Sequence, residues 1–269
     1  MAGLKKEQMV YIAVAAIMVI AVAAYLSLNY GGCTECGKQV SGSQLAEMQA
    51  IADNVSTASK VGVGIVATSG PNSNLPKQIN DSPLIVSGKP GVIYLGGDFC
   101  PFCAVTRWSF ILALMRFGNF TSLSYMRSSS SDSFANTATF SFDNYTYRSS
   151  IIGLSATEIF NRQGANNTAA DFTPMQRYLY SRYGAGIPFI DFGNRSIQSG
   201  AVISPQLLSG YDWQQIISNM SNPNTPVAQG VIGGANIFTA YICMSNATIN
   251  STASVCKEGY VKSIEAQVS

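Results

Sequence analysis

Two cysteines separated by two residues constrain the fold of this chain most, because of the segments on either side of them. Residues 91–95 are a short apolar run rich in strand-forming residues, with glycines at its limits. Cys100-Pro-Phe-Cys103 follows, and residues 104–116 then carry apolar side chains at the spacing of one helix face. A buried strand, a CxxC motif and an amphipathic helix in this order predict a thioredoxin-like fold.

The position of the motif gives its two sulfurs different expected roles. At a helix N-terminus the free N–H groups and the helix dipole favour an anion, so Cys100 is expected to be the thiolate nucleophile. Cys103, one turn later, would resolve the mixed disulfide. Asp98, Arg107 and Trp108 are candidates for tuning the thiolate, since a cation stabilises it and a carboxylate opposes it or relays a proton. An inert bridge in the same position is the alternative.

A predicted hairpin belongs to the same expected fold. Residues 184–203 contain two apolar runs about a Gly193-Asn194 turn, and Pro188 stands where the first strand begins. In thioredoxin folds a cis-proline precedes this strand, lies against the active-site sulfurs, and leaves the backbone of the preceding residue free to pair with a substrate strand. Pro188 is therefore the third candidate catalytic residue, with an ordinary proline at a strand start as the alternative.

The stretch between Cys103 and Pro188 is too long for one helix, one strand and one helix, so we expect an insertion. Residues 138–142 within it are strand-like, and residues 121–147 otherwise predict an irregular, aromatic-rich segment. Residues 127–132 predict either a flexible loop or a polar rim over the cysteines. Two further helices are predicted, over residues 174–182 and 204–217.

The other four cysteines form two pairs that are local in sequence. An even number of cysteines in an exported chain favours disulfides. We expect Cys243 and Cys256 to staple a loop that follows a buried helix over residues 235–242. Cys33 and Cys36 are interpreted as a structural clip, or as a second redox pair that exchanges with the CxxC motif. The wide spacing between the first two pairs argues against a zinc site, and we expect no metal and no cofactor.

The N-terminus predicts a membrane anchor. Residues 9–28 carry no charge and are long enough, as a helix, to cross a bilayer. Lys5 and Lys6 precede them, so the N-terminus is expected in the cytoplasm and the remainder outside. We therefore expect a single-pass plasma-membrane protein with an extracytoplasmic ectodomain. A cleaved signal peptide is the alternative, although its apolar region is normally shorter.

The expected fold class is α/β, a thioredoxin-like mixed sheet flanked by helices, with an insertion between the CxxC helix and the proline hairpin. An amphipathic stalk helix is predicted over residues 43–60. The parts of the chain are a cytoplasmic tail (1–8), a transmembrane helix (9–28), a juxtamembrane segment with the first cysteine pair and the stalk (29–74), the ectodomain (75–260) and a C-terminal tail (261–269).

Composition narrows the classes of function. Only 11% of residues are charged and the net charge is +2, which argues against a nucleic-acid-binding surface. The chain has no histidine, so Ser-His-Asp and Cys-His catalysis and His-ligated metals are excluded. Sparse carboxylates suit an acidic exterior, where they would be protonated and would not solubilise a surface.

Asn-x-Ser/Thr signals along the whole ectodomain fit an exported glycoprotein, although several arise by chance in a chain rich in these residues. The acceptors are Asn54, Asn80, Asn119, Asn144, Asn166, Asn194, Asn219, Asn246 and Asn250.

Several long motifs resemble one protein family. CPFCAVTRW, ALMRFGNF, SSSSD, TATFSF, IPFIDFGN and GGANIFTAYIC are similar to an uncharacterised prokaryotic domain of unknown function with a thioredoxin-like fold, common in thermoacidophilic archaea. The resemblance covers residues 74–256. It implies the motif at Cys100 and Cys103, the Arg107-Trp108 pair behind it, and the terminal cysteines, and it implies no substrate. Exported disulfide oxidoreductases are similar at the level of fold only, and this motif lacks the histidine often found inside theirs.

These features predict a membrane-anchored extracytoplasmic thiol-disulfide oxidoreductase. Its partners would be exported cysteine-containing proteins or a membrane redox partner. The alternative is a non-catalytic, disulfide-stapled glycoprotein that serves as a structural or accessory subunit of a membrane or cell-surface complex. A Cys100 sulfur buried beneath the insertion would favour this alternative.

Overall fold

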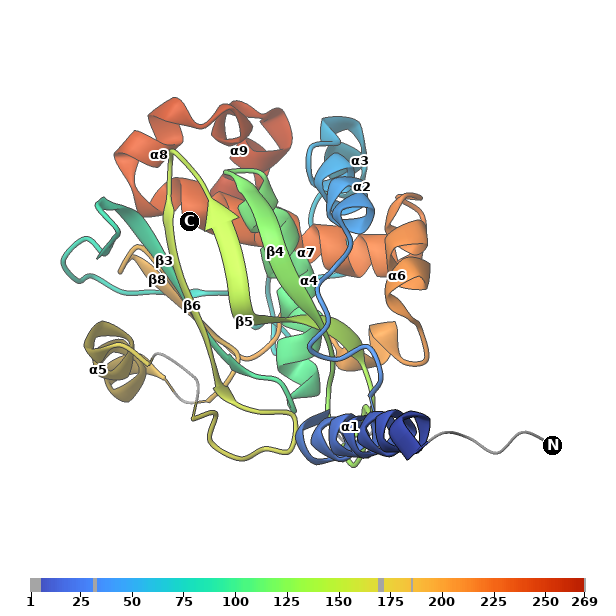
Figure 1. The fold of residues 1–269 in the computed structure, drawn as a ribbon. Helices are drawn as coiled ribbons and strands as arrows, with labels where there is room; N and C mark the ends of the chain where they lie inside the picture. The colour runs from blue at the N-terminus through green and yellow to red at the C-terminus, as the bar shows by residue number, and fades with distance from the viewer. Residues whose placement is uncertain (1–5, 31–32, 169–171, 185, 269) are drawn as a thin grey trace.

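The computed structural model describes residues 6–30, 33–168, 172–184 and 186–268, and it shows an α/β fold with a mixed sheet flanked by helices (Figure 1). Strand β3 is central: it pairs in parallel with β6 on one side and antiparallel with β7 on the other, and β7 forms a hairpin with β8. The strands of this sheet are β1 (Lys77–Gln78), β2 (Ile85–Val86), β3 (Lys89–Gly97), β6 (Gly153–Phe160), β7 (Phe189–Phe192) and β8 (Ser196–Ser199).

The sequence of β3 explains its central place. Val92, Ile93, Tyr94 and Leu95 are all buried, so both faces of the strand are covered. An uninterrupted apolar run of this kind is typical of a strand with helices or another sheet on both sides. The strand predicted over residues 91–95 is confirmed, as is the hairpin about Gly193.

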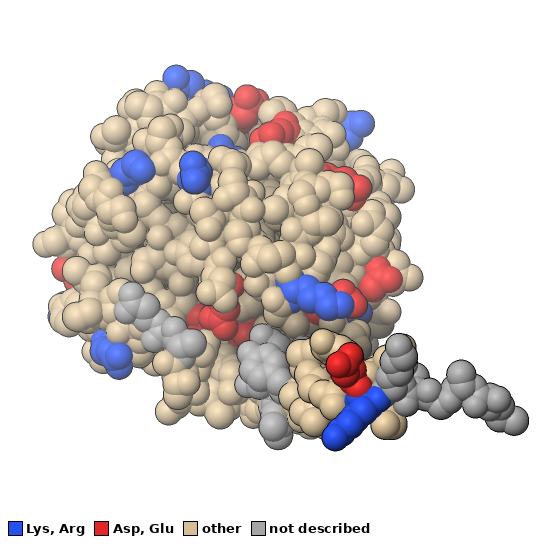
Figure 2. All heavy atoms as spheres, in the orientation of Figure 1, with Lys and Arg blue, Asp and Glu red and all other residues tan. Residues whose placement is uncertain are grey.

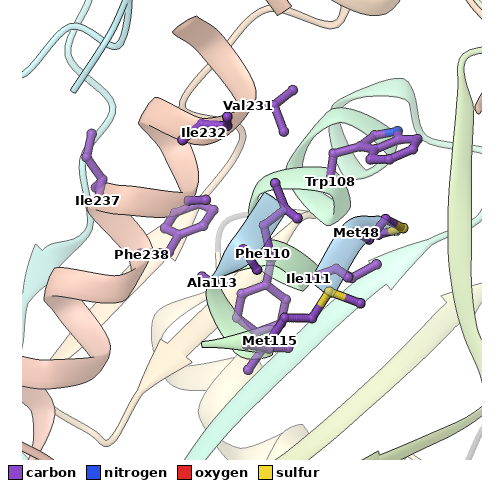
Figure 3. Close-up of a cluster of buried hydrophobic side chains, with 14 of the residues drawn as sticks. Met48, Trp108, Phe110, Ile111, Ala113, Met115, Val231, Ile232, Ile237 and Phe238 are labelled. Carbon is purple, nitrogen blue, oxygen red and sulfur yellow. The ribbon is translucent and has the colours of Figure 1, made fainter. Parts of the chain in front are cut away.

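Helices α4 (Pro101–Met115) and α7 (Pro226–Ser245) pack side by side in the main core. Phe110 of α4 meets Phe238 of α7 at a centroid distance of 6.2 Å, and both rings are buried (Figure 3). α7 is long and apolar enough to cross a membrane, but it is almost entirely buried inside the fold. Helices apolar on all sides occur in protein cores as well as in membranes, and the burial of α7 identifies it as a core helix.

The N-terminal helix α1 (Lys6–Tyr30) has the opposite environment. Its segment Lys6–Ala24 has a mean hydropathy of 2.0 and lies outside the core. The chain therefore has an N-terminal helix long and apolar enough to span a membrane. Lys5, part of the expected orientation signal, lies outside the described residues.

The segment predicted to be a stalk is instead part of the core. It forms two helices, α2 (Gly42–Ala52) and α3 (Val55–Val61), because Asn54 caps a new helix by accepting a hydrogen bond from the Thr57 N–H. Met48 of α2 is fully buried and lies beside Ile111 and Met115 of α4 (Figure 3). The boundary expected at residue 74 therefore does not separate a stalk from a body.

The insertion is more regular than the sequence predicts. β4 (Asn119–Arg127) and β5 (Ala138–Arg148) form an antiparallel sheet of their own, which lies over α4 (Figure 1). The expectation of an irregular aromatic-rich segment is wrong, since residues 119–127 and 138–148 form two paired strands, and along β5 the aromatic side chains largely alternate with polar ones.

The remaining helices differ in their limits from the prediction. The helix expected over residues 174–182 is α5 (Pro174–Tyr183). The helix expected over residues 204–217 is broken into the 3₁₀ turn η1 (Pro205–Leu208) and α6 (Trp213–Met220), because Gly210 adopts a φ of +80°. The loop expected between the last two cysteines contains α8 (Ala247–Thr252) and the 3₁₀ turn η2 (Ser254–Lys257).

The expected C-terminal tail is the helix α9 (Gly259–Val268). Val261 and Ile264 on this helix are buried in the core, so residues 261–268 belong to the folded body. Charged side chains are sparse on the face drawn in Figure 2, where neutral residues cover most of the surface. This agrees with the low charged fraction of the sequence.

Candidate functional site

The CxxC motif lies where β3 ends and α4 begins. Cys100 is the N-cap residue of α4 with extended backbone angles, and Pro101 occupies the first turn, where its missing N–H costs no hydrogen bond. The Cys103 N–H donates to the Cys100 sulfur over 3.3 Å. The predicted order of strand, CxxC and helix is confirmed.

The two thiols differ in acidity. The pKa of Cys100 is lowered to about 7, mainly because the Cys103 thiol donates a hydrogen bond to its sulfur, with smaller help from backbone N–H groups and from Arg107. Burial raises the pKa of Cys103 well above its ordinary value. Both cysteines are free thiols. At pH 7 about half of Cys100 is therefore present as the thiolate, while Cys103 keeps its proton.

Cys100 is close to the surface but not open to it. Its residue is 6% exposed, whereas the neighbouring Phe102 is 46% exposed. Residues 128–137, which we call the insertion loop, join β4 to β5 and contact two residues near Cys100, Phe99 and Phe102. The Ser129 N–H donates to the Phe99 carbonyl over 2.8 Å, and the Phe134 ring meets Phe102 edge-on. Ser129, from the segment 127–132, thus lies against the residue before Cys100, and a polar rim over the cysteines stays a prediction.

A buried ion pair lies one turn farther along α4. Arg107 donates from Nε to Glu158 Oε1 over 2.8 Å and from Nη2 to Glu158 Oε2 over 2.5 Å. The same Nη2 donates to the Gly97 carbonyl over 2.8 Å. Arg107 is therefore fixed between β3 and β6, and its positive charge lowers the pKa of Cys100.

Asp98 joins this cluster from the end of β3. Its Oδ1 lies 3.6 Å from Arg107 Nη2, and the carboxyl is buried. Burial first, and the neighbouring Glu158 second, raise the pKa of Asp98 well above its usual range. The environment therefore favours the protonated acid, which can exchange a proton with a neighbouring group.

Trp108 has its contacts elsewhere. Its indole N–H donates to the Ala138 carbonyl over 2.8 Å, and its ring packs against Phe140. These partners belong to β5, so Trp108 holds the inserted sheet against α4. A tuning role for Trp108 stays a prediction.

Pro188 lies where β7 begins, and the Ile187–Pro188 peptide bond is cis. The Ile187 side chain approaches the end of β3: its Cδ1 is 3.0 Å from the place where a Cβ on Gly97 would stand. Within the described part of the chain, the backbone N–H and C=O of Ile187 make no hydrogen bond. The structure thus brings the proline loop to the strand end that carries the CxxC motif.

Sequence reasoning missed Glu158 and Phe134. A single carboxylate inside the otherwise uncharged segment 153–160 was the available signal for Glu158, since such a residue in a buried strand needs a partner. Nothing local in the sequence marks Phe134, because its contact with Phe102 depends on how the β4–β5 hairpin lies over α4.

The four remaining cysteines form the two expected disulfides, Cys33–Cys36 and Cys243–Cys256. The metal site considered for the first two pairs is therefore not formed. Across the described ranges, no three Cys, Asp or Glu side chains come together as metal ligands.

One expected glycosylation site is contradicted by the structure. Asn194 is 7% exposed and its Nδ2 donates to the Ser82 carbonyl over 2.6 Å, so the folded protein has no room for a glycan on that atom. The other acceptors are exposed or half-buried: Asn54, Asn80, Asn119, Asn144, Asn166, Asn219, Asn246 and Asn250.

The fold and the site define a mixed α/β protein with two buried thiols at the start of a core helix. The chain belongs to the family described as Domain of unknown function (DUF929), whose model matches residues 76–179 and 163–244. The matched ranges include the CxxC motif, Glu158 and Pro188. No curated protein and no solved structure matches the chain.

Proposed function

We infer that this protein is a membrane-anchored extracytoplasmic thiol-disulfide oxidoreductase with a thioredoxin-like fold. The observation that carries the proposal is the unequal thiol pair: Cys100 has a pKa lowered to about 7, and Cys103, one turn deeper, has a raised pKa. A thiolate near neutral pH with a protonated partner is what nucleophilic attack and resolution require.

The order of elements supports the thioredoxin-like assignment. β3 leads through the CxxC helix α4 to β6, which is parallel to β3, and the hairpin β7–β8 then pairs antiparallel with β3 on its other edge. The cis-proline precedes that hairpin, as expected. The sheet β4–β5 is the insertion between α4 and β6.

The proposed reaction is a two-electron exchange. The Cys100 thiolate attacks one sulfur of a client disulfide, forming a mixed disulfide and releasing one client thiolate. Cys103 then loses its proton and attacks the Cys100 sulfur, which releases the second client thiolate and leaves Cys100–Cys103 oxidised. The reverse sequence oxidises a client dithiol. Asp98 would take part in the proton transfer, and its burial and raised pKa, which favour a bound proton, support this role.

The client would bind as an extended segment beside Pro188. Ile187 offers one N–H and one C=O without partners in the described structure, and an antiparallel strand needs such a pair. The exposed ring of Phe102, two residues after Cys100, offers an apolar contact. Because Cys100 is only 6% exposed, binding requires the insertion loop to move away from Phe99 and Phe102.

The burial of Cys100 favours a second candidate function. If the insertion loop stays closed, Cys100 and Cys103 would serve as a static bridge in a structural or accessory subunit of a membrane or cell-surface complex. In either case α1 would be the single membrane anchor, with a cytoplasmic N-terminus and a glycosylated ectodomain.

The two candidates are separated by the full chain in detergent, assayed for reduction of insulin and for isomerisation of scrambled ribonuclease. We expect activity in the wild type, loss of activity in Cys100→Ser, and retention in Cys243→Ala/Cys256→Ala as the matched cysteine control. Activity that survives Cys100→Ser would exclude the proposed enzyme. A Cys100–Cys103 reduction potential above about −230 mV supports a working couple, and one below about −300 mV supports the structural role.

A further inference from the structure

A cavity of about 520 Å³ lies beside the Cys33–Cys36 disulfide. Its wall includes Cys33, Arg127, Ser130, Asn136, Arg162 and Trp213. This volume is in the range of sites that hold small molecules. We propose that the cavity binds an anionic low-molecular-weight thiol, and that this ligand exchanges with the Cys33–Cys36 disulfide.

Two guanidinium groups make the cavity selective for an anion. Arg162 is 4% exposed; its Nε donates to the Arg127 carbonyl over 2.9 Å and its Nη2 to Asn136 Oδ1 over 2.8 Å. Arg127 donates from Nη1 to the Asn136 carbonyl over 2.9 Å and lies over the Trp213 ring at 4.4 Å. These neutral contacts orient both cations.

The positive charges of Arg127 and Arg162 also repel each other. Burial, followed by the charge of Arg127, lowers the pKa of Arg162, and burial lowers the pKa of Arg127. A ligand carboxylate or phosphate placed between them relieves this repulsion and forms charge-assisted hydrogen bonds, which are stronger than neutral ones.

Three of the described acidic side chains bear on the charge of the cavity. Glu35 lines the cavity, but its carboxylate pairs with Lys38 over 3.2 Å at the surface. Asp212 and Asp98 act on Arg127 and Arg162 through longer-range attraction that is weaker than the effect of burial.

The disulfide has one accessible sulfur and one shielded sulfur. Cys33 is half-buried and lines the cavity, whereas Cys36 is 2% exposed. The Cys36 N–H donates to the Cys33 sulfur over 3.2 Å, a contact that would stabilise a Cys33 thiolate. A ligand held by the arginines therefore meets Cys33 first.

The exchange balances with two ligand molecules. The first ligand thiolate attacks Cys33, forming a ligand–Cys33 disulfide and releasing the Cys36 thiolate. The second ligand thiolate attacks the sulfur of the bound ligand, releasing the ligand disulfide and the Cys33 thiolate. Two electrons pass from two ligand thiols to the protein disulfide, and the thiol protons go to solvent. The inference rests on the proposed function only where these electrons continue to Cys100.

The test uses the full chain in detergent with Cys100→Ser/Cys103→Ser. This variant keeps the Cys33–Cys36 disulfide that faces the cavity and lacks the CxxC thiols, which could exchange with it. The probes are mercaptosuccinate, which is anionic, 2-mercaptoethanol, which is neutral, and cysteamine, which is cationic. For each probe, the second-order rate constant for reduction of Cys33–Cys36 is corrected for the fraction of the probe that is present as thiolate. It is then divided by the rate constant with which the same probe reduces 2-hydroxyethyl disulfide. We expect mercaptosuccinate to exceed 2-mercaptoethanol by about tenfold at low salt, and to lose this advantage in 1 M salt.

Two variants assign the preference to the cavity. Arg127→Gln should remove the preference for mercaptosuccinate, whereas Arg148→Gln, an exposed arginine at the other end of the β4–β5 sheet, should keep it. Equal normalised rates for the three thiols in the unsubstituted cavity, or an unchanged preference in a folded Arg127→Gln, would overturn the proposal. The dependence of the rates on salt also tests whether charge causes the preference for mercaptosuccinate, and it needs no substitution at the cavity.

The outcome is independent of the Cys100 assays. A retained anion preference together with failed insulin reduction would remove the proposed oxidoreductase and leave the ligand site. Insulin reduction with no anion preference would support the proposed oxidoreductase and exclude the ligand site.

Discussion

Arg107 and Glu158 form a two-point ion pair, Nε to Oε1 and Nη2 to Oε2, in which neither side chain is exposed. The two residues come from α4 and β6, so the pair connects the CxxC helix to the strand parallel to β3. It also determines where the positive charge near the thiols lies. The same contact therefore bears on stability and on the acidity of Cys100.

Breaking this pair from one side should be costly. Arg107→Met leaves Glu158 as a buried, unpaired carboxylate, and we expect a loss of about 3–5 kcal/mol in the free energy of unfolding. The double variant Arg107→Met/Glu158→Gln should lose less than the sum of the two single losses, because the amide carries no charge. Urea unfolding of the full chain in detergent measures this, with exposed Arg148→Gln as control. Strictly additive losses would contradict the pairing.

The acidity of Cys100 gives a second prediction. Alkylation of Cys100 by iodoacetamide should rise with pH and level off above about 7, falling about tenfold per pH unit below that value. Cys103→Ala should raise the pKa of Cys100 more than Arg107→Met does, since the Cys103 thiol is the larger cause of the shift. Cys100→Ser is the control for other reactive thiols. A Cys100 pKa of about 8.5 or higher, the free-thiol value, would count against catalysis.

Stability should increase towards acid pH because of Asp191. Burial raises its pKa to about 7, above the unfolded value of about 3.9, so the folded state binds the extra proton between these values. The contribution of Asp191 to the free energy of unfolding is fully present below about pH 4. It is lost as pH rises to about 7, by about 1.4 kcal/mol per pH unit. Asp143, with a pKa raised to about 6, acts in the same direction. The lowered pKa of the half-buried Asp81 acts in the opposite one.

Urea unfolding at pH 4 and pH 7.5 measures this dependence, and Asp191→Asn tests its source. The neutral amide retains an oxygen for the Asn194 N–H, so the variant should unfold with a flatter pH profile than the wild type. A profile as steep in Asp191→Asn as in the wild type would assign the effect to other groups.

The packing of α2 on the core predicts a large effect at Met48. Met48→Ala removes a fully buried side chain and should cost about 2–5 kcal/mol, whereas exposed Glu47→Ala on the same helix should change stability by less than about 1 kcal/mol. Both are measured by the same unfolding transition. A free stalk helix would make the two substitutions equally mild.

The disulfide Cys243–Cys256 should stabilise the C-terminal helices. It closes a sequence separation of 13 residues, for which the chain-entropy model gives about 3 kcal/mol. Cys243→Ala/Cys256→Ala should lower the unfolding midpoint in urea accordingly, and reducing agent should produce no further loss from this bond in the variant. An unchanged midpoint would mean that burial of α9 alone holds this end of the chain.

The sequence predicts those parts of the fold that are set by neighbouring residues. β3, the motif and α4 follow from strand propensity, a proline in the first turn and helical spacing, all within about thirty residues of chain. The hairpin after Pro188 likewise follows from its turn at Gly193. These local features also placed Cys100 and Cys103 correctly at the helix start.

Contacts between distant segments were not predictable in the same way. The periodicity around Met48 shows that one face of the helix is apolar, but not that α4 covers it, so a stalk was inferred. Arg107 and Glu158 are 51 residues apart, and neither carries a local sign of the other. β4 was missed because its adjacent residues Leu123 and Ser124 are both buried and one of them is polar, which breaks the strand alternation.

The path of the insertion loop joins two parts of the molecule that the chain separates widely. Ser129 on this loop holds Phe99 beside Cys100, while Ser130 and Asn136 form the wall next to Cys33. A displacement that uncovers Cys100 therefore also reshapes the space beside Cys33. If a ligand beside Cys33 binds one position of this loop more tightly than another, it should change the free energy of uncovering Cys100 by the same amount, and the reverse should hold as well.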